Sequence, residues 1–193
     1  MSPTMGGLDL RSRLTRRLLA PRLEPVRLLI CDVDGVLTDG GLHYDERGGV
    51  VKRFNVRDGL AIRMLQRSGI EVAFLSGGRS GAIEQRARHL DIRHCLVGVG
   101  DKLAALQDLL DQLGLERSHT AFIGDDLNDL TVRPAVGLLV SPANGARGLR
   151  RQADLVLHQN GGDGAVRELA ELLLHQRGHW QTLSREGWRD TNS

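Results

Sequence analysis

The sequence predicts an α/β protein built as a single, doubly wound parallel-sheet domain of the Rossmann-like type, with a β-hairpin flap. Two observations predict this fold. Short apolar runs, typical of strands buried on both faces of a parallel sheet, alternate with segments of helical periodicity. The chain has 193 residues, of which 40% are hydrophobic and 26% charged, as expected for one globular domain with a sizeable core.

The first elements follow the chain in this order. Residues 26–31 (VRLLIC) form an apolar run and predict the first buried strand. Residues 41–56 contain two short alternating stretches around a Gly-Gly turn, which predict a β-hairpin that projects from the sheet. Residues 58–67 have the apolar spacing of a helix, and Gly69 ends it. The apolar residues 70–75 then predict the second strand of the sheet.

The second half repeats this alternation and ends in a helix. Gly114 closes the best-defined helix, and the glycine-rich segment 160–164 interrupts the chain before an amphipathic helix. Residues after Gly178 are polar and are expected to be loose. Further strands are expected at 94–97, 120–123, 136–140 and 155–157, and further helices at 81–90, 102–113, 144–150 and 165–177.

Three parts are expected along the chain. Residues 1–25 form an N-terminal extension, 26–158 the core with its hairpin, and 159–193 the glycine-rich loop, C-terminal helix and polar tail. The extension is expected to form an amphipathic helix on the surface of the fold. It carries four arginines among leucines, namely Arg11, Arg13, Arg16 and Arg17.

Charge, hydropathy and cysteine content narrow the class of protein. The net charge of +2 predicts neither a nucleic-acid partner nor a membrane surface. No apolar run approaches the roughly 18 residues that cross a bilayer. Cys31 and Cys95 lie in apolar runs, as expected for buried, reduced thiols. The expected compartment is therefore the cytoplasm.

Polar side chains stand where the predicted strands end. Asp32 and Asp34 directly follow the first strand, and Ser76 follows the second. Asp125 comes just after the strand at 120–123, and Lys102 stands at the start of a helix. In doubly wound sheets, ligands bind beyond the carboxyl ends of the strands. We therefore expect these five side chains to meet at one edge of the sheet.

These residue types favour phosphoryl transfer. Asp32 and Asp34 are two residues apart, so their side chains point to the same side of an extended strand end. Together with Asp125 they are anions that repel, and hard oxygen ligands of this kind suit Mg²⁺. Asp32 is the candidate nucleophile and Asp34 the candidate acid and base. The Ser76 hydroxyl and Lys102 are the candidate groups for the phosphate oxygens.

Four segments resemble the haloacid dehalogenase superfamily of phosphohydrolases. They are CDVDGVLTDG (31–40), FNVRDG (54–59), GDDLND (124–129) and GGDGAVRELAELLL (161–174). They are similar to the capless branch that removes phosphate from 3-deoxy-D-manno-octulosonate 8-phosphate, a lipopolysaccharide precursor. The resemblance covers roughly residues 26–177. It implies a Mg²⁺-dependent phosphatase that acts on a small phosphorylated sugar acid through an aspartyl-phosphate.

The resemblance also implies a site and an assembly. Mg²⁺ is held by the Asp32 carboxylate, the Asp34 backbone carbonyl and Asp125, and Asp126 and Asp129 support these ligands. The hairpin replaces a cap domain and builds the core of a homotetramer. The glycine-rich segment closes over a neighbour's active site and brings Arg167 near it. The implied substrate contacts are Asp34, Asn55, Val56, Arg57, Asp58, Gly59, Arg63, Gly78, Arg86 and Lys102.

One departure from the family concerns the substrate. The family usually has Thr-Gly-Arg after the second strand, whereas this chain has Ser-Gly-Gly-Arg at 76–79. The arginine is either displaced to Arg79 or replaced by Gly78, and the two residues differ by a full charge and a long reach. A phosphatase for a related nonulosonate 9-phosphate is therefore the close alternative.

Proteins of other classes fit the sequence less well. A non-catalytic phosphate-binding relative would have lost at least one of the four central residues, and all four are present: Asp32, Asp34, Lys102 and Asp125. A phosphotransferase or mutase needs to exclude water, and no cap-sized insertion is available. A signalling receiver domain has no use for Asp34 or for the glycine-rich tail.

Overall fold

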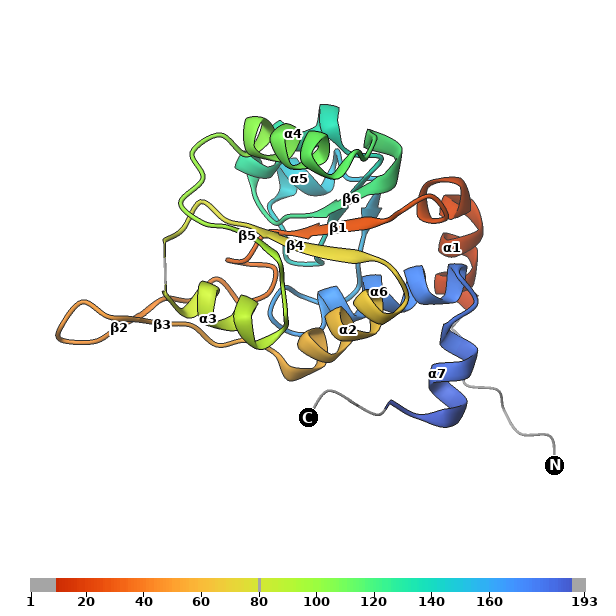
Figure 1. The fold of residues 1–193 in the computed structure, drawn as a ribbon, viewed down its shortest axis with the longest axis horizontal. Helices are drawn as coiled ribbons and strands as arrows, with labels where there is room; N and C mark the ends of the chain where they lie inside the picture. The colour runs from red at the N-terminus through yellow and green to blue at the C-terminus, as the bar shows by residue number, and fades with distance from the viewer. Residues whose placement is uncertain (1–9, 80, 189–193) are drawn as a thin grey trace.

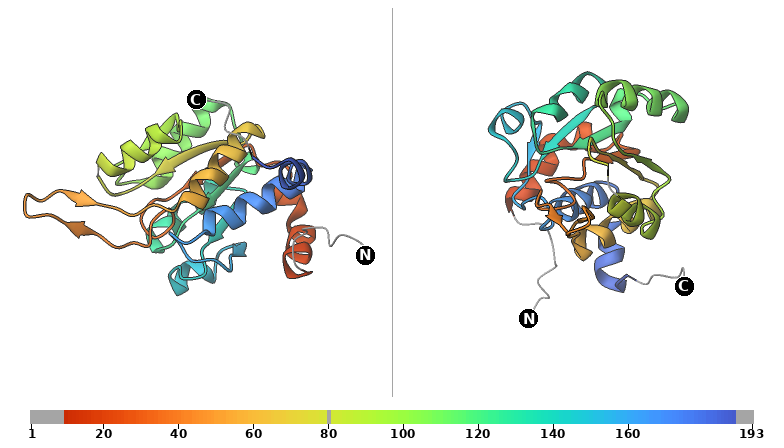
Figure 2. Two further views of the ribbon diagram at one scale, coloured as in Figure 1. Left: turned by 90° about the horizontal axis from the view of Figure 1, so that it is seen from below. Right: turned by 90° about the vertical axis from the view of Figure 1, so that its left-hand side faces the viewer.

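A parallel sheet of six strands forms the centre of the computed structural model, which describes residues 10–79 and 81–188 (Figures 1 and 2). The strand order is β5-β4-β1-β6-β7-β8. Because β1 pairs with β4 on one side and β6 on the other, the chain winds outward in two directions from β1. The doubly wound fold class is thus confirmed. The strands are β1 (Leu28–Cys31), β4 (Glu71–Leu75), β5 (His94–Leu96), β6 (Thr120–Ile123), β7 (Leu138–Ser141) and β8 (Leu155–Val156).

Helices cover both faces of the sheet (Figure 1). One face carries α2 (Val56–Arg67), α3 (Gly81–His89) and α6 (Ala165–Gln176), and the other carries α4 (Lys102–Leu113), the 3-10 helix η2 (Leu127–Ala135) and α5 (Arg147–Arg150). Along β1, Leu29 packs toward the first face and Leu28 and Ile30 toward the second. Both faces of the strand are buried, which explains its continuous apolar run.

A short hairpin projects from the sheet (Figure 2). It consists of β2 (His43–Tyr44) and β3 (Val50–Val51), which pair antiparallel. Its tip holds a tight turn in which Gly48 has φ +79°, a conformation that glycine adopts without strain. In the described part of the chain no cap domain is built between β1 and α2. The segment between these two elements contains only the hairpin and its flanking loops.

Two predictions about the termini need correction. Residues after Gly178 are not loose, since Trp180–Glu186 form the helix α7, and Trp180, Leu183 and Trp188 pack against the core. The helix was not predicted because its few apolar side chains are separated by polar ones. The extension does form a helix, α1 (Leu10–Leu23), which lies against α6.

The extension helix is less amphipathic than expected. Leu23 is fully buried in the core and Leu19 packs against it, but Leu14 and Leu18 are exposed. The side chains of Arg11 and Arg13 lie outside the described residues. Among the described residues, no helix has the length and apolar character required to cross a bilayer. Of the two free cysteines, Cys31 is buried as predicted, and Cys95 is only half-buried.

Candidate active site

The loop after β1 is fixed by a dense set of hydrogen bonds. The buried Thr38 hydroxyl accepts from the backbone N–H groups of Gly35 (3.4 Å) and Gly40 (3.2 Å) and donates to the Val33 carbonyl (3.4 Å). Gly35 has φ +85°, and a Cβ there would run into the Asp125 carboxylate. The loop is therefore held close to the end of β6.

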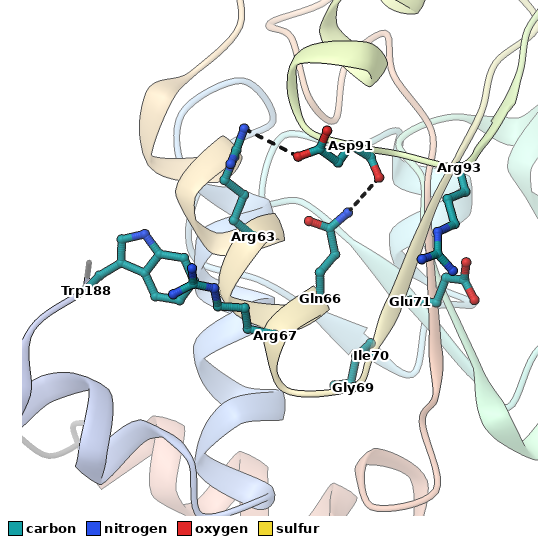
Figure 3. A pocket seen from close by; sticks show the side chains of 9 residues that line it. All are labelled: Arg63, Gln66, Arg67, Gly69, Ile70, Glu71, Asp91, Arg93 and Trp188. Atoms are coloured by element: carbon teal, nitrogen blue, oxygen red, sulfur yellow. Dashed lines mark hydrogen bonds and ion pairs between the residues drawn. The ribbon is translucent and has the colours of Figure 1, made fainter. Parts of the chain in front are cut away.

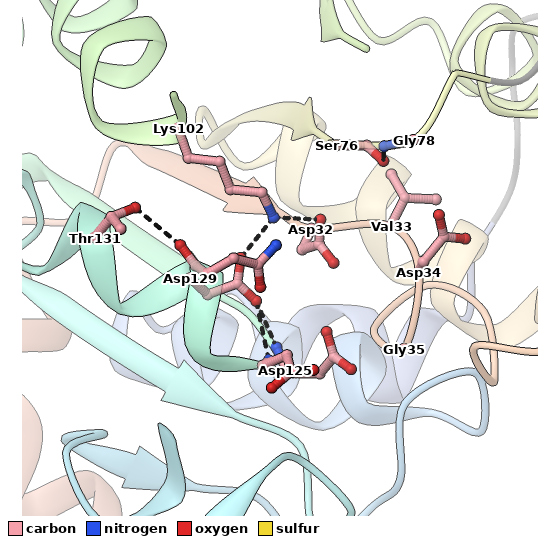
Figure 4. Close-up of polar contacts among 12 residues, drawn as sticks. Asp32, Val33, Asp34, Gly35, Ser76, Gly78, Lys102, Asp125, Asp129 and Thr131 are labelled. Atoms are coloured by element: carbon pink, nitrogen blue, oxygen red, sulfur yellow. Dashed lines mark hydrogen bonds and ion pairs between the residues drawn. The ribbon is translucent and has the colours of Figure 1, made fainter. Parts of the chain in front are cut away.

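Lys102 joins two buried carboxylates (Figure 4). Its ammonium lies 2.8 Å from Asp32 Oδ1 and 2.6 Å from Asp129 Oδ1. Asp101 caps α4 by accepting from Ala104 N–H at 3.0 Å, which sets the start of the helix and the direction of Lys102. The second oxygen of Asp129 accepts from the backbone N–H of Asp125 at 2.8 Å. Both oxygens of Asp129 are thus occupied, which agrees with a supporting role.

The carboxylates repel one another strongly. Burial raises the pKa of Asp125 to about 7, with further contributions from Asp32 and Asp129. Burial, followed by Asp129, raises the pKa of Asp32 to about 6, and Lys102 opposes this shift. One oxygen from each of Asp32, Asp125 and Asp129 lies within 4.8 Å of the others. Three acidic groups face one lysine, so the donor set fits a small, hard divalent cation such as Mg²⁺.

The raised pKa values predict a pH-dependent response to Mg²⁺. The pKa is about 7 for Asp125 and about 6 for Asp32. When the pH falls below these values, protons compete with the metal for the carboxylates. We expect a fixed Mg²⁺ concentration to raise the melting temperature of metal-free protein more at about pH 8 than at about pH 5. Without metal, stability should instead fall as pH rises through this range, because the folded state holds these protons more tightly than the unfolded chain.

The variant Asp125→Asn provides the control for this measurement. It should lose most of the Mg²⁺-induced shift at both pH values, because a charged ligand is absent. Equal shifts of the wild-type protein at the two pH values, measured by differential scanning fluorimetry, would contradict the proposed competition between protons and metal.

The segment after β4 places a glycine, not an arginine, beside Asp34. Ser76 is buried, and its hydroxyl accepts from Gly78 N–H at 3.1 Å. A Cβ at Gly78 would lie 3.0 Å from Asp34 Oδ2, so position 78 faces the site. Arg79 is exposed and lies against Gly98. Position 78, which faces Asp34, is thus a glycine, and the first arginine after the strand is the next residue, Arg79.

The segment 55–59 is used partly for structure. Asn55 caps α2 by accepting from Arg57 N–H at 2.8 Å, and its amide donates to the Gly162 carbonyl at 3.3 Å. Asp58 is buried and accepts from the backbone N–H of Gly164 (3.3 Å) and Arg167 (2.7 Å) at the start of α6. Burial raises the pKa of Asp58 in spite of these two bonds. Val56 and Arg57 are exposed, and Gly59 is buried against Arg86.

Two of the three predicted substrate arginines, Arg63 and Arg86, lie in different places. Arg86 donates to the Asn55 carbonyl at 3.1 Å and lies 5.6 Å from the centre of the Phe54 ring, close to the predicted site. Arg63 instead donates to the His89 carbonyl at 2.7 Å, and it lines a pocket of 450 Å³ at the amino end of β4 (Figure 3). Asp32 lies at the carboxyl end of the neighbouring strand. Within one chain, Arg63 is therefore not brought to the aspartates.

Lys52 was not predicted, but it belongs to the site. It lies just after β3, and its ammonium pairs with Asp34 Oδ1. Its side chain is only 3% exposed. In a hairpin whose polar and apolar residues alternate, a lysine is expected to face solvent. The sequence pattern therefore did not predict this contact.

The glycine-rich segment packs on its own chain. Gly161, Gly162 and Gly164 are buried, and Gly162 N–H donates to the Val36 carbonyl at 2.8 Å. The Arg167 side chain pairs with Glu171 at 2.6 Å and stacks on Trp180, away from the loop after β1. A segment so rich in glycine is not expected in a core, yet glycines without side chains fit closely against the backbone of that loop.

The fold and the site together define a class of protein. A doubly wound sheet with aspartates and a lysine beyond its carboxyl ends is the arrangement of a haloacid dehalogenase-like hydrolase, and the model of that family matches residues 51–137. The 3-deoxy-D-manno-octulosonate 8-phosphate phosphatase of Salmonella typhi is 45% identical over 144 residues, which are 75% of this chain and 77% of that protein. The chain belongs to the family of these phosphatases.

Solved structures show the same relationship. The 3-deoxy-D-manno-octulosonate 8-phosphate phosphatase from Yersinia pestis has a TM-score of 0.82 and 43% identity, covering 83% of this chain and 87% of that one. The enzyme from Moraxella catarrhalis, solved with magnesium ion, phosphate ion and KDO, has a TM-score of 0.84 and 37% identity. That comparison covers 88% of this chain and 98% of the other. The likeness thus extends across nearly the whole fold.

Proposed function

We propose that the protein is a Mg²⁺-dependent phosphatase that hydrolyses 3-deoxy-D-manno-octulosonate 8-phosphate to the free sugar acid and phosphate. The observation that carries this proposal is the cluster of Asp32, Asp125, Asp129 and Lys102, found in a chain 45% identical to phosphatases of that substrate. The reaction serves the synthesis of a lipopolysaccharide precursor. The protein is therefore an enzyme of the phosphoric monoester hydrolase class.

Each residue has a defined part in the proposed reaction. An oxygen of Asp32 attacks phosphorus and forms an aspartyl-phosphate, and Asp34 protonates the leaving sugar oxygen. Asp34 then takes a proton from the water that hydrolyses the intermediate. The Lys102 ammonium, 2.8 Å from Asp32, and the Ser76 hydroxyl bind the phosphate oxygens. Mg²⁺, held by Asp32, Asp125 and the Asp34 backbone carbonyl, supplies the positive charge that allows two anions to approach.

A second substrate is favoured by one observation. Position 78 faces Asp34, and glycine leaves space where the family usually has an arginine. A nine-carbon sugar acid is one carbon longer and needs additional room. A nonulosonate 9-phosphate is therefore the alternative substrate of the same site.

A panel of substrates tests the proposal. Phosphate release should be fastest from 3-deoxy-D-manno-octulosonate 8-phosphate, with kcat/KM at least about tenfold above that for hexose phosphates, and should stop when EDTA removes Mg²⁺. A higher kcat/KM for the nonulosonate 9-phosphate would establish the alternative. Comparable release from all sugar phosphates would contradict a sugar-acid specificity of either kind.

The hairpin supports the proposed homotetramer. Leu42, Tyr44, Val51 and Val56 are large apolar residues on or beside it, and all are exposed in the single chain. Burial of such side chains between copies stabilises an assembly. Light scattering after size exclusion should give four times the monomer mass, and the hairpin substitution Tyr44→Lys should reduce the measured mass.

Two free cysteines suit the cytoplasm as the place of action.

A further inference from the structure

Lys52, whose side chain is buried, forms an ion pair with the proposed acid and base. Its side chain is 3% exposed, whereas the Asp34 side chain is 33% exposed. A buried ammonium costs several kcal/mol in lost hydration unless a counter-charge lies against it. Asp34 Oδ1 provides that counter-charge. The contact therefore differs from a surface ion pair, in which both side chains move freely and little stability is gained.

The pair leaves one oxygen of Asp34 for chemistry. Oδ1 faces Lys52, and Oδ2 faces Gly78, at which a Cβ would lie 3.0 Å from it. A carboxylate that is held by one oxygen presents the other in a fixed direction. Transfer of a proton to the leaving oxygen requires a separation of about 2.6–3.2 Å, so this direction matters for the rate.

We propose that Lys52 is a positioning residue, which holds Asp34 so that Oδ2 points to the leaving oxygen of the substrate. The inference rests on the proposed function, because Asp34 acts as acid and base only in that reaction. In this role Lys52 acts on the reaction through Asp34. The segment that follows β3 thereby contributes to catalysis through Asp34.

Removal of the charge from Lys52 provides the test. In Lys52→Met, release of the sugar acid in a single turnover should slow by about tenfold. KM, measured in the steady state, should change less than about twofold. Release of p-nitrophenol from p-nitrophenyl phosphate should slow less than about twofold, because this leaving group needs little protonation. Lys52→Arg should restore part of the lost rate. Arg53→Met removes a neighbouring charge, one that pairs with Asp39 at 3.3 Å, and should behave as wild type.

A double-mutant comparison separates positioning from a structural effect. In an Asp34→Asn background, Lys52→Met should slow release of the sugar acid no further, since there is no carboxylate to orient. A further tenfold loss in that background would overturn the inference, as would a higher KM with unchanged kcat, which indicates direct binding of substrate. If Lys52→Met does not fold, Lys52→Gln takes its place. A wild-type protein that releases no phosphate defeats the proposed function, whereas an active wild type matched by Lys52→Met defeats this inference alone.

Discussion

Replacing Asp32 by asparagine is expected to lower turnover to below about a thousandth of the wild-type value, because the amide cannot attack phosphorus. The fold should survive the change. Asp32 is one of three acidic groups that repel one another, and burial already raises its pKa to about 6. Lys102 keeps its contact with Asp129 at 2.6 Å. Phosphate release and a thermal melt, measured on the same preparation, check both parts of this prediction.

A matched control is available one residue before Lys102. Asp101→Asn makes the same chemical change at an exposed helix cap, where asparagine is as effective as aspartate. It should leave both turnover and melting temperature unchanged. A folded Asp32→Asn protein that keeps a tenth of wild-type activity would remove Asp32 from the nucleophile role.

The strands and the central site residues were predictable because both follow local rules. β1 and β6 are buried on both faces, so their sequences are continuous apolar runs. The carboxyl ends of parallel strands meet at one edge of the sheet. Residues placed directly after them, such as Asp32 and Asp125, are therefore brought together by topology alone. No side-chain geometry was needed to expect this cluster.

The features that were missed depend on contacts between distant segments. Lys52, just after β3, contacts Asp34 in the loop after β1, 18 residues earlier in the chain. Asp58 was predicted only as a substrate contact, and its carboxylate also accepts from the backbone at the start of α6, more than 100 residues away. Arg63 lies on α2, as Asp58 does, but lines a pocket at the amino end of β4. The spacing of residues in the sequence does not indicate in which direction these side chains point.

The glycine-rich segment illustrates the same limit for a whole loop. Its composition is typical of an exposed linker, because polar residues and glycines seldom form a core. In the structure the glycines allow two backbones to touch, and Gly161 lies against the carbonyl of Gly35. The loop that carries Asp32 and Asp34 thus packs against the C-terminal part of the same chain, and this contact affects catalysis.

Gly161→Ala is expected to reduce kcat by about 30- to 100-fold and to lower the free energy of unfolding by about 1–3 kcal/mol. The added Cβ would collide with the Gly35 carbonyl oxygen, which is backbone and cannot move alone. The loop must shift, and Asp34 shifts with it. Gly161 lacks a left-handed φ, so alanine adds bulk there without backbone strain. In the control Gly81→Ala, the new Cβ meets no atom of the described residues within 4 Å, and activity should stay unchanged.

The same variant decides whether the segment acts within one chain or on a neighbour. Because the contact with Gly35 lies within the chain, mixed oligomers of Gly161→Ala and Asp32→Asn chains should be no more active than the sum of the two separate proteins. The Asp32→Asn chains have an intact segment but no nucleophile, and each Gly161→Ala chain keeps its nucleophile in a displaced loop. Recovery of activity in verified mixed oligomers would mean that an intact segment from one subunit completes the site of another, as the family pattern implies. Its absence, together with the loss in Gly161→Ala alone, would place the support of the nucleophile loop within each subunit.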